Sequence, residues 1–393
     1  MNLCVLINSL TLGGAEKIAL TLCEEYRKKG INVIFVCLEK NDFYKINNNK
    51  IYYLSDQTGA KESTPKKLLY LFIFALRLKK LVKRENISIV QSHLYRANYV
   101  NVLAKLLGSG HKAQIVNHGI VSRYDKEHLT GKVNLFLIKR LYSRADQIIL
   151  NSKGMMSDLK RIGRFRNDIG VINNPFDLNE IARLSEEAFN EDEFVFNKEK
   201  KYLVAVGRLE KVKRITDIVK AVGILKEKSC EVELVILGDG SEKNTILDLI
   251  DRLQLKDRVH LLGRVSNPFK YVSKADILIS ASEYEGFSNV IVEALILGTA
   301  VISTDCESGP REILSPKSDV NIKLKPGEVE FSEFGVLVPV GDYETMAMAV
   351  EDLLSERSRR IEYGEKGIKR ARAFDKALIT DNYMIKLRSL MGK

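Results

Sequence analysis

The chain has few of the residues that mark several protein classes. Its 393 residues contain only 7 prolines and 5 cysteines, and the cysteines are scattered, with no C-x-x-C pair and no metal-ligand spacing. Disulfide scaffolds, collagen-like chains and low-complexity chains are therefore excluded. We expect the cysteines to act as small hydrophobic residues in a reducing compartment.

Long apolar runs and a secretion signal are also missing from the pattern. The best candidate for a membrane span, residues 68–78, is interrupted by Arg77 and flanked by lysines, so no membrane-crossing helix is expected. Residues 1–8 lack a basic start and a cleavage site, and they run directly into a strand-like stretch. The sequence therefore predicts a cytoplasmic protein.

Positive charge is concentrated in one half of the chain. Residues 1–175 hold 29 Lys and Arg against 13 Asp and Glu, a net charge of +16, whereas the remainder holds 33 against 38, a net charge of −5. The N-terminal half is therefore expected to face an anionic partner, such as a phospholipid surface or a phosphorylated substrate. Nucleic acid is disfavoured because no aromatic-rich or zinc-finger pattern accompanies the basic residues.

Residues 64–83 are predicted to form a helix with two possible roles. Their apolar residues cover more than one helical stripe, which favours burial in a core. The lysines and arginines between them also fit a helix that lies on an anionic membrane surface. Both roles can hold together, with the core on one side and lipid on the other.

Short apolar runs alternate with amphipathic helical stretches, a pattern typical of parallel sheets covered by helices. Strands are expected at residues 3–8, 32–38, 87–91, 114–117, 147–151 and 170–173, and again at 202–207, 232–238, 259–262, 277–280, 300–303 and 335–338. Helices are expected in the first half at residues 14–29, 65–84, 98–107 and 132–142. The chain is an α/β protein on this evidence.

The length and the turn residues at 172–177 predict two domains. We expect one Rossmann-like domain at 1–175, a second at 176–375, and a C-terminal helix at 376–393 that packs back on the first domain. Two such doubly wound sheets are expected to face each other across a cleft, with ligands bound by the loops that follow strands.

The segment 282–295 follows a predicted strand and opens a helix. Gly286 is expected to make the turn, and Ser288 or Asn289 is suited to cap the helix, whose free amides form an anion site. Glu285 lies just outside the helix, and Glu293 follows about two turns later on roughly the same side. One carboxylate can face a sugar and the other a ribose, although paired carboxylates are also common on capped surface helices.

A second segment, V-G-R-L-E-K-V-K at 206–213, ends the first strand of the second half. Arg208 and Lys213 are five residues apart, and two such cations can neutralise a leaving nucleoside diphosphate. A solvated helix start is the alternative interpretation.

In the first half, L-G-G-A-E at 12–16 follows a strand and begins a helix. Gly13 and Gly14 permit close approach of a phosphate or a sugar. Dinucleotide binding is disfavoured because G-x-G-x-x-G is absent and Glu39 is a weak candidate for a ribose ligand. His118 and His93 each end a predicted strand, where a side chain reaches ligands, although a lone histidine is often structural.

These motifs together resemble the retaining GT-B glycosyltransferases of family 4. The family's E-G-F-x-x-x-x-x-E matches Glu285 and Glu293, and G-R-L-x-x-x-K matches Arg208 and Lys213. Arg214 replaces the usual glycine after that lysine, which leaves open a shift of the lysine's role to Arg214. The segment D-C-E-S-G-P-R-E at 305–312 resembles bacterial transferases that extend polyprenyl-diphosphate-linked oligosaccharides for capsule, O-antigen or N-glycan precursors.

The resemblance implies transfer of a hexose or N-acetylhexosamine, with retention, from a nucleotide diphosphate sugar to a lipid-linked or free saccharide. The donor is expected to be a UDP-sugar. In this family pattern the domain at 176–375 is the nucleotide-sugar-binding domain and the domain at 1–175 is the acceptor-side domain. The resemblance implies the following residues: catalytic Glu285 and His118; nucleotide-sugar-binding Gly14, Arg208, Lys213, Gly286, Phe287, Ser288, Asn289 and Glu293; acceptor-side Gly13, His93 and Arg96. No cofactor or metal is expected, because D-x-D at a strand end and His/Cys metal spacing are absent. The expected location is peripheral, on the inner face of the cytoplasmic membrane.

Two other functions remain open from the sequence. A nucleotide-sugar 2-epimerase also uses tandem Rossmann-like domains and a nucleoside diphosphate, but it needs acid and base residues for elimination. A non-catalytic membrane-surface protein could keep the fold. The intact motif carboxylates and cations argue against a non-catalytic protein.

Overall fold

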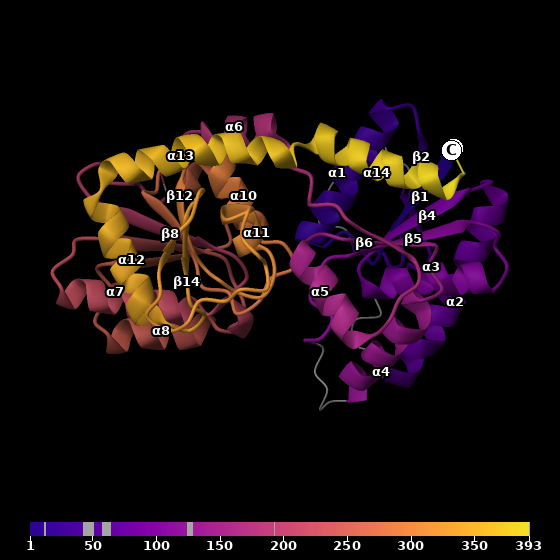
Figure 1. Ribbon diagram of the computed structural model, residues 1–393, viewed down its shortest axis with the longest axis horizontal. Helices are drawn as coiled ribbons and strands as arrows, with labels where there is room; N and C mark the ends of the chain where they lie inside the picture. The colour runs from indigo at the N-terminus through magenta and orange to yellow at the C-terminus, as the bar shows by residue number, and fades with distance from the viewer. Residues whose placement is uncertain (12, 42–50, 57–63, 124–128, 192, 393) are drawn as a thin grey trace. The chain divides into compact units, whose positions relative to one another are not determined.

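The computed structural model describes the chain except for residues 12, 42–50, 57–63, 124–128, 192 and 393 (Figure 1). The chain forms two compact units, one made of Met1–Phe176 together with Asp375–Lys393 and the other of Asp177–Phe374. It leaves the first unit at the turn-rich segment that the sequence marks as a boundary, and it returns there for its last helix.

The first unit is, within the described residues, a seven-stranded parallel sheet covered by helices. Its strands are β1 (Asn2–Ile7), β2 (Asn32–Cys37), β3 (Ile51–Tyr53), β4 (Ile89–His93), β5 (Lys112–Asn117), β6 (Gln147–Leu150) and β7 (Asp168–Val171). Its helices are α1 (Gly14–Lys28), α2 (Thr64–Arg84), α3 (Tyr95–Leu106), α4 (Leu129–Leu137), which continues as a π-helix over Ile138–Tyr142, α5 (Lys153–Ile162) and α14 (Lys376–Leu390). The strand order is β3-β2-β1-β4-β5-β6-β7.

The core of the first unit lies where α1 and α14 cover one face of this sheet (Figure 1). Because parallel strands are covered on both faces, β1 is apolar from Leu3 to Ile7, and all five of these residues are fully buried. Helix α14 contributes Ile379, Tyr383 and Leu387, at helical spacing, to the same core. The expected return of the C-terminal helix to the first domain is therefore confirmed.

The second unit has, in its described part, another seven-stranded sheet. Its strands are β8 (Tyr202–Val206), β9 (Glu233–Leu237), β10 (Val259–Gly263), β11 (Ile277–Ser280), β12 (Ala300–Thr304), β13 (Glu330–Phe331) and β14 (Val336–Val338). Its helices are α6 (Leu178–Ser185), α7 (Ile215–Glu227), α8 (Lys243–Arg252), α9 (Phe269–Val272), α10 (Asn289–Ile296), α11 (Pro310–Leu314), α12 (Tyr343–Ser355) and α13 (Arg357–Ala371). The strand order is β10-β9-β8-β11-β12-β14-β13, and only β13 pairs antiparallel.

The predicted strands are all present, with ends shifted by no more than about two residues. The sequence missed β3 and β13, edge strands too short to show a period. It also placed the start of α3 three residues late, because Asn8 at the end of β1 caps that helix by accepting from the backbone N–H of Ala97 at 3.0 Å. Because this capping side chain comes from a distant part of the sequence, the residues around the start of α3 do not reveal it.

The strand order reverses between β1 and β4 in the first sheet and between β8 and β11 in the second. At such a point neighbouring loops leave in opposite directions, so a crevice opens beyond the carboxyl ends of the strands. The motif-bearing loops follow these strands in both units. Within the described ranges no helix is long and apolar enough to cross a membrane.

Candidate active site

The loops after β8 and β11 bring the two main sequence motifs of the second unit together. Lys213 Nζ lies 2.6 Å from Glu285 Oε1, and both side chains are largely buried, at 23% and 13% exposed. Ser282 Oγ donates to the same oxygen at 2.7 Å. The backbone N–H of Glu283 donates to Val212 O at 2.8 Å, which joins the two loops. The structure therefore places a cation and a carboxylate side by side at the order reversal of the sheet.

The other basic residues of this loop point elsewhere. Arg214 adopts a left-handed backbone conformation, and its Nε donates to Asp217 at 2.6 Å. The Arg208 side chain is 73% exposed and lies 3.7 Å from Glu210. The sequence leaves open whether Lys213 or Arg214 takes the role of the motif lysine. Lys213 is the one that contacts Glu285.

Close backbone packing against the loop after β9 fixes the shape of the loop after β8. This packing was not expected from the sequence. A Cβ on Gly238 would lie 1.8 Å from Gly207 O, and one on Gly240 would lie 2.4 Å from Leu209 O. The backbone N–H of Leu209 donates to Asp239 O at 3.0 Å. The signal was present as G-D-G directly after β9, a pattern that permits two chains to touch.

The start of α10 is built differently from the expected cap. Ser288 occupies the N-cap position with φ 76°, its side chain makes no cap hydrogen bond, and its buried Oγ has no partner among the described residues. The left-handed conformation falls on Ser288 and not on Gly286. A non-glycine residue is strained in this conformation, and buried residues of this kind cluster at functional sites.

The remaining nucleotide-sugar-binding candidates of this segment differ in burial. The Phe287 ring is buried and packs edge-on against Phe374, with 5.5 Å between ring centroids. Phe287 can therefore offer a ligand its backbone only. Asn289 begins α10, and Glu293 lies half-buried in its second turn.

The 305–312 motif supports this loop and does not line a separate site. Arg311 donates to both oxygens of Asp305 at 2.9 and 2.8 Å, and this ion pair is almost completely buried. Ser308 Oγ donates to Gly286 O at 2.9 Å, and a Cβ on Gly309 would lie 2.4 Å from Phe287 O. The motif therefore holds the Gly286–Ser288 backbone in place.

In the first unit the G-G-A-E loop follows β1. A Cβ on Gly13 would overlap the carboxylate of Glu16, so a side chain at this position would require that carboxylate to move. Thr11 Oγ1 donates to Glu16 Oε1 at 3.0 Å. Gly14 is exposed and opens α1, and it leaves the helix start accessible.

The two candidate histidines are in direct contact. His93 Nδ1 and His118 Nε2 are 2.9 Å apart, and Asn151 Nδ2 donates to His118 Nδ1 at 2.9 Å. Burial lowers the pKa of His118 to about 4, and burial together with His118 holds the pKa of His93 well below its usual value. Both rings are therefore neutral at physiological pH, and both nitrogens of His118 are hydrogen-bonded.

Arg96, the remaining acceptor-side candidate, forms an ion pair within its own unit. Its Nη2 lies 2.5 Å from Oε1 of the buried Glu39. Leu94, between His93 and α3, has φ 71°. Glu39, the one weak candidate for a dinucleotide ribose, is thus paired with a cation.

No group of three His, Cys, Asp or Glu in the described ranges is arranged to hold a metal ion.

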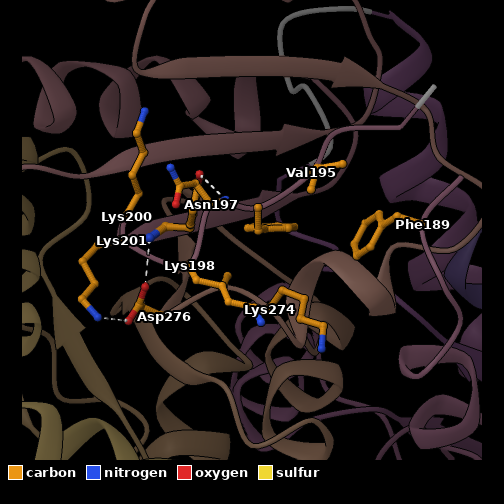
Figure 2. A pocket seen from close by; sticks show the side chains of 11 residues that line it. Phe189, Val195, Asn197, Lys198, Lys200, Lys201, Lys274 and Asp276 are labelled. Carbon is orange, nitrogen blue, oxygen red and sulfur yellow. Dashed lines mark hydrogen bonds and ion pairs between the residues drawn. The ribbon is translucent and has the colours of Figure 1, made fainter. Parts of the chain in front are cut away.

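A pocket of about 390 Å³ in the second unit is lined by Lys198, Lys200, Lys201 and Lys274 beside Asp276 (Figure 2). Lys201 Nζ lies 3.3 Å from Asp276. These residues precede β8 and β11, so the pocket lies at the amino ends of the strands, opposite the motif loops.

Comparisons with known proteins identify the family of the chain. Residues 12–180 match the family model described as Glycosyltransferase Family 4, and residues 186–370 match that of Glycosyl transferases group 1. The chain is 33% identical over 380 residues to the N-acetylgalactosamine-N,N'-diacetylbacillosaminyl-diphospho-undecaprenol 4-alpha-N-acetylgalactosaminyltransferase of Campylobacter jejuni, covering 95% of this chain and 96% of the relative.

Two further similarities extend over nearly the whole chain. A second C. jejuni enzyme, the GalNAc-alpha-(1->4)-GalNAc-alpha-(1->3)-diNAcBac-PP-undecaprenol alpha-1,4-N-acetyl-D-galactosaminyltransferase, is 25% identical, with 98% of this chain and 97% of the relative covered. The crystal structure of Anabaena Alr3699/HepE in complex with UDP superposes with a TM-score of 0.76 at 18% identity, covering 99% of this chain and all of the other. The chain therefore belongs to the family 4 glycosyltransferases and has their GT-B fold.

Proposed function

We propose that this glycosyltransferase moves a hexose or N-acetylhexosamine from a UDP-sugar to a saccharide carried on polyprenyl diphosphate, with retention of configuration. The contact between Lys213 and Glu285 beside the start of α10 carries the proposal. It supplies a cation for a leaving diphosphate, a carboxylate for a sugar and backbone amides for an anion at one edge of one sheet.

The donor diphosphate is proposed to bind Lys213, Arg208 and the amides at the start of α10. Lys213 has three donor hydrogens, so it can hold Glu285 and a phosphate oxygen together. The exposed Arg208 is free to swing onto the diphosphate. Glu285 is proposed to face the transferred sugar, with Glu293 facing the ribose. Gly14, at the exposed start of α1, is the proposed contact from the first unit.

Retention is proposed to proceed without a covalent intermediate on the protein. Oε1 of Glu285 already accepts from Lys213 and Ser282, which lowers its reactivity as a nucleophile. In the proposed mechanism an oxygen of the leaving phosphate assists the acceptor hydroxyl on the same face of the sugar. The protein contributes charge stabilisation and orientation, and the reaction is proposed to need no metal.

The acceptor is proposed to bind the first unit, near His118, His93, Arg96 and Gly13. The C. jejuni relative at 33% identity is named for transfer to a diphospho-undecaprenol-linked saccharide. The net charge of +16 on residues 1–175 fits a diphosphate-bearing, membrane-borne acceptor. We propose that the enzyme works at the inner face of the cytoplasmic membrane.

Helix α2 offers a surface for that membrane. Its Leu68, Leu69, Phe72 and Leu76 side chains are 39–60% exposed along one stripe, whereas Leu71, Phe74 and Leu78 are buried on the opposite side. The helix thus has one face buried in the core and one exposed apolar face, the combination that the sequence analysis considered possible. Exposed lysines flank the stripe, which suits an anionic lipid surface.

The reaction is tested by incubating the enzyme with UDP-sugars and a polyprenyl-diphosphate-linked saccharide. We expect UDP release only when the acceptor is present, an axial α-linkage in the product, and an unchanged rate after exhaustive EDTA treatment. Conversion of the nucleotide sugar without acceptor would instead identify a 2-epimerase. A rate that EDTA abolishes and Mg²⁺ restores would contradict the metal-free mechanism.

Replacing the proposed diphosphate ligands should weaken nucleotide binding. Each of Lys213→Ala and Arg208→Ala removes a charge-assisted contact worth roughly 1.5–3 kcal/mol, or about a 10- to 150-fold rise in the Kd for UDP by calorimetry. Lys211→Ala, which changes an exposed lysine of the same turn, is the matched control and should bind as the wild type does. Wild-type UDP affinity in both test variants would remove these residues from the donor site.

The two motif carboxylates should affect different kinetic quantities. Glu285→Gln is expected to lower kcat by at least about 100-fold with little change in UDP affinity, because removing a single electrostatic contact at a transition state costs about that much. Glu293→Gln should weaken UDP binding more than it lowers kcat. Glu344→Gln, an exposed change in the same unit, serves as the control. A normal kcat for Glu285→Gln would show that this carboxylate does not face the sugar.

Binding to vesicles should depend on the exposed lysines beside the α2 stripe. Replacing Lys66, Lys80 and Lys83 by Gln is expected to release the enzyme from anionic vesicles and slow transfer to a lipid-linked acceptor, while UDP binding is unchanged. The attraction acts within a Debye length of about 8 Å at physiological salt, so co-sedimentation should fall as salt rises. Lys79 is left intact because its Nζ donates to Leu107 O at 2.6 Å.

The matched control for this experiment changes three exposed lysines of the second unit, Lys256, Lys317 and Lys325, to Gln. It should bind vesicles as the wild type does. Equal binding of the wild type to neutral and anionic vesicles, or binding to neither, would show that the charge of the first unit serves something other than a membrane.

A further inference from the structure

A row of amide side chains crosses the buried sheet of the first unit. Gln91 on β4, Gln114 on β5 and Gln147 on β6 are register partners, and each is fully buried. The same row reaches Asp168 on β7. Buried amides cost free energy unless they are hydrogen-bonded, so three in one row of a core require a shared explanation.

The amides satisfy one another in one continuous chain. Gln91 Nε2 donates to Gln114 Oε1 at 2.6 Å, and Gln114 Nε2 donates to Gln147 Oε1. Gln147 Nε2 donates to Asp168 Oδ2 at 2.6 Å. Lys386 Nζ on α14 lies 3.0 Å from Asp168 Oδ1, so the row ends on an ion pair at the surface.

The other end of the row reaches the histidine pair. Gln91 Oε1 lies 3.3 Å from His93 Nε2. From there the chain continues through the contact between His93 Nδ1 and His118 Nε2 to Asn151 Nδ2. One unbroken set of side-chain hydrogen bonds therefore connects the loops after β5 and β6 with the C-terminal helix.

The carboxylate of Asp168 fixes the direction of every bond in this set. Although burial opposes it, hydrogen bonds from Lys386 and Gln147 lower the pKa of Asp168, so the group is ionised and can only accept. Gln147 must then present its NH₂ to Asp168 and its oxygen to Gln114. The same orientation repeats at Gln114 and Gln91.

The direction of hydrogen-bond donation continues from Gln91 into the imidazole rings of His93 and His118. Gln91 Oε1 also accepts from Tyr26 Oη at 3.3 Å, and it faces His93 Nε2 at the same distance. A bare Nε2 would set one lone pair against another, so His93 must carry its hydrogen on Nε2 and leave Nδ1 as an acceptor. His118 must then donate from Nε2, and its Nδ1 accepts from Asn151. Neutral imidazole has one hydrogen, so each ring is restricted to a single tautomer.

We propose that Gln91, Gln114, Gln147 and Asp168 are positioning residues that hold His93 and His118 as neutral rings with the hydrogen on Nε2. The placing of His118 near a ligand rests on the proposed function, but its tautomer does not. With its hydrogen directed at His93, His118 can offer a ligand only an acceptor, at Nδ1. A group that replaces Asn151 there must be a donor, such as a sugar hydroxyl.

The test is the tautomer of each ring in the free protein, read by NMR from two-bond ¹⁵N–¹H correlations of ¹⁵N-histidine-labelled enzyme at neutral pH. His93→Gln and His118→Gln variants assign the signals. We expect both rings to be neutral and protonated at Nε2. A hydrogen on Nδ1 of either ring, or a charged ring, would overturn the proposal.

A single remote change should invert both tautomers. In Asp168→Asn, Lys386 retains the remaining oxygen, so the new NH₂ faces Gln147 and reverses each amide in turn. We expect the hydrogen of both His93 and His118 to move from Nε2 to Nδ1, across the width of four strands. Asn151 is then expected to turn its Oδ1, which has no partner among the described residues, toward His118 Nδ1. The Asp168 side chain is 47% exposed, so the fold should tolerate the change. Unchanged tautomers in this variant would show that the carboxylate does not set the direction.

Asp146→Asn is the matched control. Asp146 is also a carboxylate of this sheet paired with a lysine, at 2.8 Å from Lys105 Nζ, but it accepts from the backbone N–H of Ala113 and lies outside the row. Its replacement should leave both tautomers unchanged, and inversion there would also overturn the proposal. The measurement needs no donor, acceptor or turnover, so its result is independent of whether the proposed reaction is right.

Discussion

The structure depends on one constraint: parallel strands end at the same edge of a sheet, and the strand order reverses once in each unit. At the reversal the helices that follow β1 and β4 in the first unit, and β8 and β11 in the second, pack on opposite faces of the sheet, so the carboxyl ends of these strands stay uncovered. Residues separated by many positions in the chain, such as Lys213 and Glu285, meet at that edge because their strands are neighbours. The donor site proposed for the second unit lies at that edge.

Much of what surrounds that edge serves to hold backbone in place. Gly207 and Gly238 allow two loops to touch, and the buried Asp305–Arg311 ion pair fixes the segment that supports Ser288. A buried ion pair adds little net stability, but it has only one geometry in which both charges are satisfied. This rigidity explains how Ser288 can keep a left-handed backbone conformation at the start of α10.

In the first unit, hydrogen bonds between neutral side chains hold the two candidate histidines, whereas in the second unit a buried ion pair supports the motif loop. The central strands of the first unit carry a row of amides through the core, and that row ends at one side on the histidine pair and at the other on α14. The C-terminal helix is therefore joined to the sheet by apolar packing and by the polar contact of Lys386 with Asp168. Apolar packing alone would not specify the orientation of an imidazole ring, because it cannot distinguish the two ring nitrogens.

The sequence by itself determined the fold class, the strand positions and the motif loops, because buried parallel strands and glycine turns leave local patterns. It singled out Glu285 and Lys213 as candidates but gave no sign of their contact, and it assigned Phe287 to a ligand although its ring packs on Phe374. The contact of His93 with His118, the pairing of Arg96 with Glu39 and the amide row were decided only by the tertiary structure. Each joins residues on different strands or loops, and the register that brings them together comes from the packing of the whole sheet.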